Sequence, residues 1–116
     1  MKTKSKSLIY TITTIYLDND KDGIDKIDWK KYRDRCVGFY FSCETALKCV
    51  DEDWADFDEG CYYNYLVIEK LIEGLYPSIS PDSDEQMWFK YERENDKWVR
   101  CEKPHSLRHI VGFSIG

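Results

Sequence analysis

Alternating carboxylates make the segment of residues 18–25 the first candidate for chemistry. Asp18, Asp20 and Asp22, followed by a glycine, match the first half of a calcium loop. In such loops alternate carboxylates converge on a hard cation, and the glycine permits a sharp turn. The twelfth loop position, which should supply a bidentate Glu, is Trp29, so Asp25 or Asp28 would have to substitute. This segment therefore has two interpretations: a calcium site, as in a small metal-dependent hydrolase, or a solvated polar turn.

A second candidate metal site combines one cysteine with both histidines of the chain. Cys101, His105 and His109 are spaced four apart, and on one continuous helix they would share a face as three zinc ligands. Pro104 opposes this, because the residue before a proline resists helical geometry. A structural or surface role is the expected one.

Residues 51–59, DEDWADFDE, combine six carboxylates with two aromatic rings. Such a stretch can be a helix end and loop kept soluble by charge. It can also dock on a basic surface of another protein, where charge speeds encounter and an aromatic ring provides burial. We take the docking surface as the leading hypothesis, for a non-enzymatic protein that modulates or inhibits its partner. Its predicted residues are Asp51, Glu52, Asp53, Trp54, Asp56, Phe57, Asp58 and Glu59.

Aromatic side chains support an alternative hypothesis, a small-ligand protein that binds a nucleotide. The chain has nine Tyr and four Trp, and 16% of its residues are aromatic. Exposed rings can stack on a base while Lys or Arg contacts phosphate. The rings predicted for this role are those of Tyr62, Tyr63, Trp88 and Trp98.

Composition limits the classes of partner. The chain has 116 residues and a formal net charge of −5, which argues against binding nucleic acid through its phosphates. No apolar run reaches the length of a membrane span. Five cysteines without a CxxC pair do not form a disulfide framework, so a reducing cytoplasm is expected. The length predicts one domain, residues 1–116, and a homodimer is compatible with every hypothesis.

Residues 37–71 form the unit around which the other elements are expected to assemble. Val37, Phe39 and Phe41 alternate along one strand face, and Ser42 follows as a helix N-cap. The predicted apolar helix stripe is Cys43, Ala46, Leu47, Val50 and Trp54, with Cys49 outside it. The segment 62–71 is apolar on both faces, which predicts a central strand covered on both sides.

The remaining segments add further sheet. Residues 8–17 are β-branched and aromatic, which predicts a strand antiparallel to the one at 37–41. Residues 87–92 and 97–101 flank a four-residue hairpin turn. A short helix at 105–110 and a last strand at 111–115 complete the prediction. The fold class is therefore α+β: a mostly antiparallel sheet of about five strands with one principal helix on one face, in the order β-β-α-β-β-β.

The chain resembles a class of short uncharacterised bacterial and phage proteins. The resemblance is carried by Phe41, Ser42 and Ala46 at the helix start and by the strand segment 65–69, YLVIE. Thr45 stands where that pattern prefers Glu. These motifs are structural. The resemblance implies a small cytoplasmic protein, encoded on a mobile element, that acts by binding either a host protein, for example one of a host defence, or a small signalling nucleotide.

Overall fold

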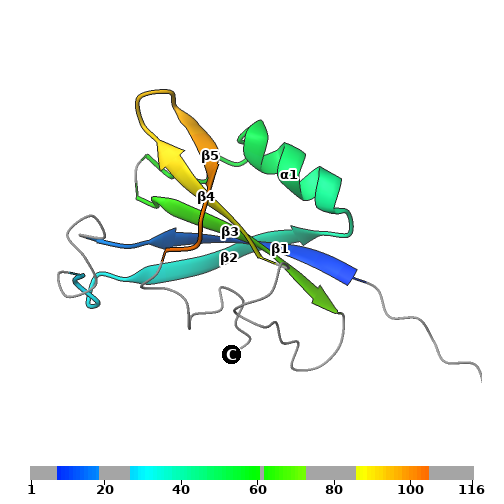
Figure 1. The fold of residues 1–116 in the computed structure, drawn as a ribbon, viewed down its shortest axis with the longest axis horizontal. Helices are drawn as coiled ribbons and strands as arrows, with labels where there is room; N and C mark the ends of the chain where they lie inside the picture. The colour runs from blue at the N-terminus through cyan, green and yellow to red at the C-terminus, as the bar shows by residue number, and fades with distance from the viewer. Residues whose placement is uncertain (1–7, 19–26, 61, 73–85, 105–116) are drawn as a thin grey trace, which may run out of the picture.

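Among the residues that the structure describes, the sheet has five strands, and every neighbouring pair in it is antiparallel. The computed structural model describes residues 8–18, 27–60, 62–72 and 86–104 (Figure 1). The strand order across the sheet is β2-β1-β3-β4-β5. The strands are β1 (Leu8–Tyr16), β2 (Arg33–Tyr40), β3 (Tyr65–Ile72), β4 (Gln86–Glu92) and β5 (Lys97–Cys101), and the helix is α1 (Cys43–Asp51). The predicted α+β fold is confirmed.

Strand β1 lies between β2 and β3 and is antiparallel to both. The strands β2 and β3 therefore run in the same direction, and α1 lies on the connection between them, as in a split β-α-β unit. The predicted pairing of the first two strands is confirmed. Strand β2 begins at Arg33, earlier than predicted, because its ladder with β1 continues to the pair Tyr16↔Arg33.

Helix α1 starts where the sequence indicated. The Ser42 hydroxyl accepts a hydrogen bond from the Thr45 N–H at 3.3 Å, and Glu44 lies in the first turn. The helix ends at Asp51, so the predicted stripe does not reach Trp54 as part of a helix.

The predicted position of Cys49 was wrong. Ala46, Cys49 and Val50 are the buried residues of the helix, which gives a stripe at i, i+3 and i+4. The Tyr40 hydroxyl donates to the Cys49 sulfur at 3.5 Å. Cys49 thus faces β2, whereas the prediction placed it outside the stripe.

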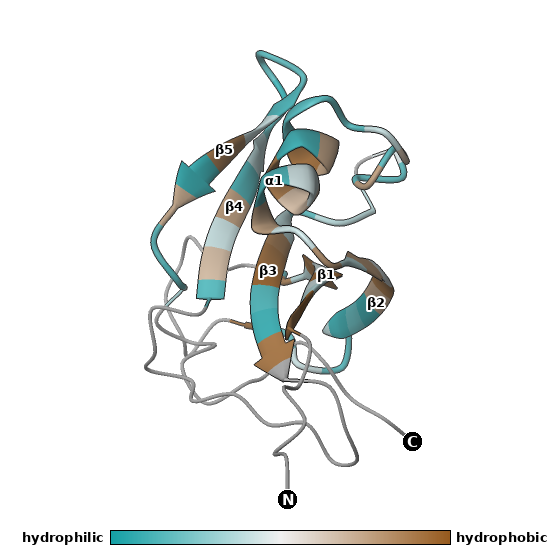
Figure 2. Ribbon diagram, turned by 90° about the vertical axis from the view of Figure 1, so that its right-hand side faces the viewer, coloured by the Kyte–Doolittle hydropathy of each residue, from teal (hydrophilic) through white to brown (hydrophobic). Residues whose placement is uncertain are grey.

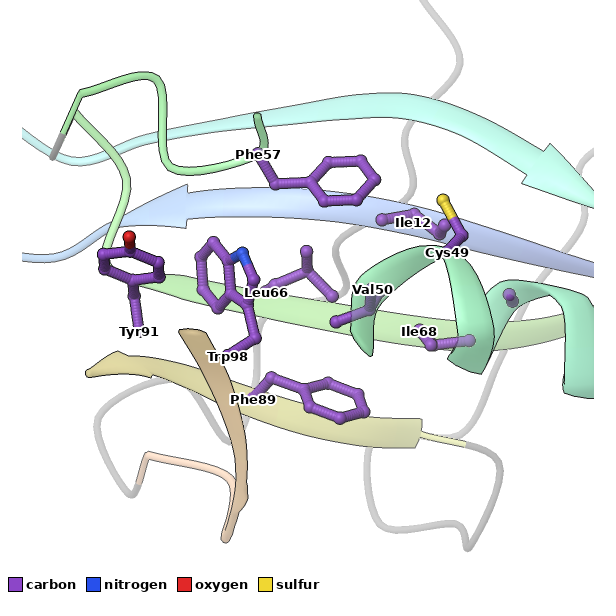
Figure 3. Packing of buried hydrophobic residues seen from close by; sticks show 10 residues of the cluster. Ile12, Cys49, Val50, Phe57, Leu66, Ile68, Phe89, Tyr91 and Trp98 are labelled. Atoms are coloured by element: carbon purple, nitrogen blue, oxygen red, sulfur yellow. The ribbon is translucent and has the colours of Figure 1, made fainter. Parts of the chain in front are cut away.

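Strand β3 is central and buried on both faces, as predicted. Leu66 and Ile68 face the helix in a cluster that includes Phe57, Phe89 and Trp98 (Figure 3). Alternate residues of β3, Tyr65 and Val67, belong to a second cluster on the opposite face with Ile15 and Trp88. Both faces of β3 are apolar, and helix α1 covers only one of them.

Asn64 extends the β1–β3 pairing beyond the start of β3. Its side-chain oxygen accepts from the Leu17 N–H at 2.9 Å, and its amide nitrogen donates to the Leu17 carbonyl at 2.9 Å. The side chain therefore takes the place of a paired backbone residue. Strand β3 begins at Tyr65, later than the predicted residue 62.

The predicted hairpin between β4 and β5 is confirmed, with Glu92 opposite Lys97 across the turn. Asp96 adopts a left-handed conformation with φ of 55°, and its carboxylate accepts a hydrogen bond from the Tyr91 hydroxyl. The elements predicted at 105–110 and 111–115 lie outside the described residues.

Candidate functional site

The acidic loop, residues 52–60, has a defined conformation after the end of α1. Asp53, Asp56 and Glu59 have positive φ values of 48°, 49° and 47°. The Asp53 carboxylate accepts from the Phe57 N–H at 3.0 Å, and the Asp58 carbonyl accepts from the Tyr62 N–H at 2.8 Å. The first of these bonds, from a backbone N–H to an Asp side chain, is typical of Asp in turns. These hydrogen bonds turn successive side chains of the loop in different directions.

The carboxylates of the acidic loop form a concentrated negative charge. Ligand oxygens of Asp53, Asp56 and Asp58 lie within 4.8 Å of one another. Asp58 is buried, Asp53 is half-buried and Asp56 is exposed. Carboxylate oxygens at this spacing suit a hard cation. The same charge equally attracts a Lys or Arg side chain.

The two aromatic residues of the acidic loop have opposite environments. Trp54 is 50% exposed and its ring contacts Tyr40 edge to face, with centroids 6.2 Å apart. Phe57 is only 5% exposed and packs in the helix-side cluster (Figure 3). Of the rings predicted to anchor a partner, Trp54 is available in this conformation, whereas Phe57 supports the core.

The other predicted docking residues are mostly in solvent. Asp51, Glu52, Asp56 and Glu59 are exposed. Two of them have cationic partners within the chain: Glu52 lies 3.9 Å from the Lys48 ammonium, and Glu59 lies 3.3 Å from the Arg35 guanidinium. The second pair joins the acidic loop to β2.

The second half of β2 is more exposed than its apolar sequence predicts. Val37 is 38% exposed, Phe39 54% and Phe41 71%, and the rings of Phe39 and Phe41 lie edge to face at 5.7 Å. In Figure 2 this half of β2 is brown and its first half is teal. The exposure follows from the edge position of β2, which depends on long-range pairing that the local pattern does not contain.

A surface pocket of about 310 Å³ joins these exposed residues to the acidic loop. It lies between the second half of β2, the end of α1 and the loop, and its lining includes Val37, Phe39, Trp54 and Ala55. Exposed apolar side chains that gather beside a pocket are candidates for a binding surface. We call the exposed apolar residues Val37, Phe39, Phe41 and Trp54 the β2-edge surface.

The four rings predicted for nucleotide stacking are not brought together. Tyr62 is exposed, and the central carbon of the Arg33 guanidinium lies over its ring, 4.3 Å from the ring centroid. Tyr63 is buried beside it. Trp88 and Trp98 are also buried, but in the clusters on opposite faces of the sheet. The arrangement therefore offers no shared stacking surface among these four residues.

The predicted metal sites fall mostly outside the described residues. Asp18 is described; one of its carboxylate oxygens accepts from the Tyr16 hydroxyl at 3.1 Å, and the other lies 3.7 Å from the Lys31 ammonium. Asp20, Asp22 and Asp25 lie outside the described part of the chain, as do His105 and His109. Cys101 is half-buried, and this burial raises the pKa of its thiol.

A buried polar group on the face away from α1 was missed by sequence analysis. Glu69 is fully buried in β3, where the Gln86 amide donates to its carboxylate at 3.0 Å. The Trp88 indole N–H in turn donates to the Gln86 oxygen at 3.4 Å. The signal was present in the sequence, because the alternation of β3 assigns a charged residue to a face that is otherwise apolar.

Comparison with protein families, characterised sequences and solved structures finds no match for this chain. No helix among the described residues has the length and apolar character needed to cross a membrane. Without a match, the features of this chain that bear on its function are the acidic loop and the β2-edge surface.

Proposed function

We propose that this protein acts without catalysis, by binding another protein through the β2-edge surface and the neighbouring acidic loop. The observation that carries the proposal is the exposure of Val37, Phe39 and Trp54 around one pocket, with the exposed ring of Phe41 against Phe39. An exposed Trp in an apolar pocket with a polar rim has the features of an interface hot spot.

The acidic loop indicates the charge of the partner. Asp51 and Asp56 are exposed, and the Asp56 carboxylate is part of the group of three that lies within 4.8 Å. A basic partner surface would be attracted at long range and would gain ion pairs on contact. Binding of this kind would modulate or inhibit the partner by covering part of its surface.

The first experiment is affinity purification from extracts of the source cells with three forms of the protein. The wild type is compared with the double variant Phe41→Ala/Trp54→Ala and with Trp29→Ala. Trp29 is a matched control because it is 45% exposed and belongs to neither the pocket nor the acidic loop. We expect a protein that is retained by the wild type and by Trp29→Ala and is lost from the double variant.

The affinity of that protein then tests the role of charge. Trp54→Ala should weaken binding by about 2 kcal/mol, the usual size of a hot-spot loss. Asp51→Lys/Glu52→Lys/Asp56→Lys should also weaken binding and should flatten its dependence on salt concentration. Equal retention of every bound protein by all forms would refute the proposed function.

A further inference from the structure

We propose that the partner contributes an extended basic and apolar segment, which pairs with the second half of β2 as a sixth strand of the sheet. This inference rests on the proposed function and names the form of the partner at the same surface. Addition of a strand to an exposed sheet edge is a common mode of peptide recognition.

The edge position of β2 provides the backbone for such pairing. Within the described residues β2 has β1 on one side and no strand on the other. Every residue from Arg33 to Val37 is exposed, and Phe39 is exposed as well. An edge strand presents a row of N–H and C=O groups that another chain can pair with.

Apolar side chains occur on both faces of this edge. Phe39 lies opposite Thr11 in the ladder, and Thr11 belongs to the sheet face away from α1. Tyr40 packs with the helix-side cluster, and its ring contacts Trp54. Since side chains of a strand alternate between faces, an added strand would meet apolar neighbours on both of its sides.

The first half of β2 limits how far the pairing can extend. The Arg33 guanidinium stacks over Tyr62, and Arg35 pairs with Glu59. The register of β2 with β1 shifts between Ile12 and Thr13, which leaves Val37 as an extra residue between Cys36 and Gly38. A bulge of this kind increases the local twist and interrupts a long flat edge. The added segment is therefore short and lies along the second half of β2, from Val37 at the bulge to Tyr40.

Charge complementarity selects a segment of another protein as the occupant. Most residues that line the pocket beside this half of β2 are apolar, and the grouped carboxylates of Asp53, Asp56 and Asp58 alternate along the chain with its lining residues Trp54, Ala55 and Phe57. A Lys or Arg next to the apolar residues of the segment would meet this charge at Asp56, which is the exposed member of the group. A second copy of the chain has a net charge of −5 and is less complementary to the acidic loop.

Gly38 offers a way to close the pocket without disturbing the fold. It lines the pocket, and a Cβ added to it would meet no atom within 4 Å. Its backbone also lacks the positive φ that excludes other residues. Gly38→Leu should therefore fold normally and occupy the space that the segment needs. Gly38→Ala is the matched control, with a smaller side chain.

The test starts from a display library of random peptides of about ten residues, close to twice the usual strand length. Selection on the wild-type protein should enrich peptides with alternating apolar residues and at least one Lys or Arg. These peptides should bind Gly38→Leu and Asp53→Asn/Asp56→Asn at least about tenfold more weakly, and Gly38→Ala within about twofold. No enrichment, or enriched peptides without basic residues, would overturn the inference.

Backbone methylation of the best selected peptide then distinguishes strand addition from side-chain docking. Methylation of amides that point toward β2 removes hydrogen bonds, and methylation of the intervening amides does not. We expect losses of about tenfold or more at alternate positions and changes within about twofold between them. Uniform effects along the peptide would overturn strand addition. The proposed function would still stand if the partner is lost from Phe41→Ala/Trp54→Ala, so the two failures are distinguishable.

Discussion

Trp54 and Phe57 are separated by two residues in the acidic loop, which has five carboxylates, yet one ring is half exposed and the other lies in the core. The left-handed conformations of Asp53 and Asp56 and the hydrogen bond from Phe57 N–H to Asp53 produce this division. Because the turn geometry decides it, the residue types alone could identify the segment but could not tell which ring would be exposed.

Substitution of the two rings should separate stability from binding. Phe57→Ala removes a core side chain and should lower the free energy of unfolding by about 3–5 kcal/mol. Trp54→Ala should lower it by less than about 1 kcal/mol, because half of the side chain is already in water. Urea unfolding followed by circular dichroism measures both, and similar losses in the two variants would contradict the assigned roles.

The elements were predicted best where the signal was local. The β4–β5 hairpin and the Ser42 cap depend on residues close in sequence, and both were confirmed. The start of β2 and its place at the sheet edge depend on pairing with β1, about twenty residues away along the chain. The β2-edge surface could not be predicted for the same reason.

The side chain of Asn64 supports the pairing of β1 with β3 through its two hydrogen bonds to the Leu17 backbone. Asn64→Ala leaves the Leu17 N–H and carbonyl without their partners and should cost about 1–3 kcal/mol of unfolding free energy. Asn64→Asp retains the acceptor for the Leu17 N–H and loses only the donor, so it should lie between the wild type and Asn64→Ala. Urea midpoints test the order, and an unchanged Asn64→Ala midpoint would rule out this support.

The whole molecule should lose stability at alkaline pH. The hydrogen bond to Asp96 raises the pKa of Tyr91 above its ordinary value of 10.0, and burial and the charges of Asp58 and Asp53 act in the same direction. Burial and Asp34 likewise raise the pKa of Tyr32. Above pH 10 the unfolded chain loses these protons while the folded protein keeps them, so stability is complete below that pH and falls above it.

The variant Tyr32→Phe/Tyr91→Phe provides the measurement for this pH dependence. Urea midpoints of the wild type should fall between about pH 9 and about pH 11, and those of the variant should fall less. The comparison between pH values within each protein removes the effect of the substitutions on neutral stability. Equal slopes would show that neither hydroxyl contributes to the alkaline loss.

The position of β1 between β2 and β3 also affects how the chain can fold during synthesis. Thr11 in β1 donates a hydrogen bond to the carbonyl of Glu69, 58 residues later in the chain. At about 5–20 residues per second, the ribosome completes that partner roughly 3–12 seconds after Thr11. Strand β2 is synthesised before β3, so one edge of β1 can pair with β2 while its other edge is still unpaired. One edge of β1 thus stays unpaired for seconds during synthesis, and an unpaired strand edge exposes the nascent chain to aggregation and to chaperones.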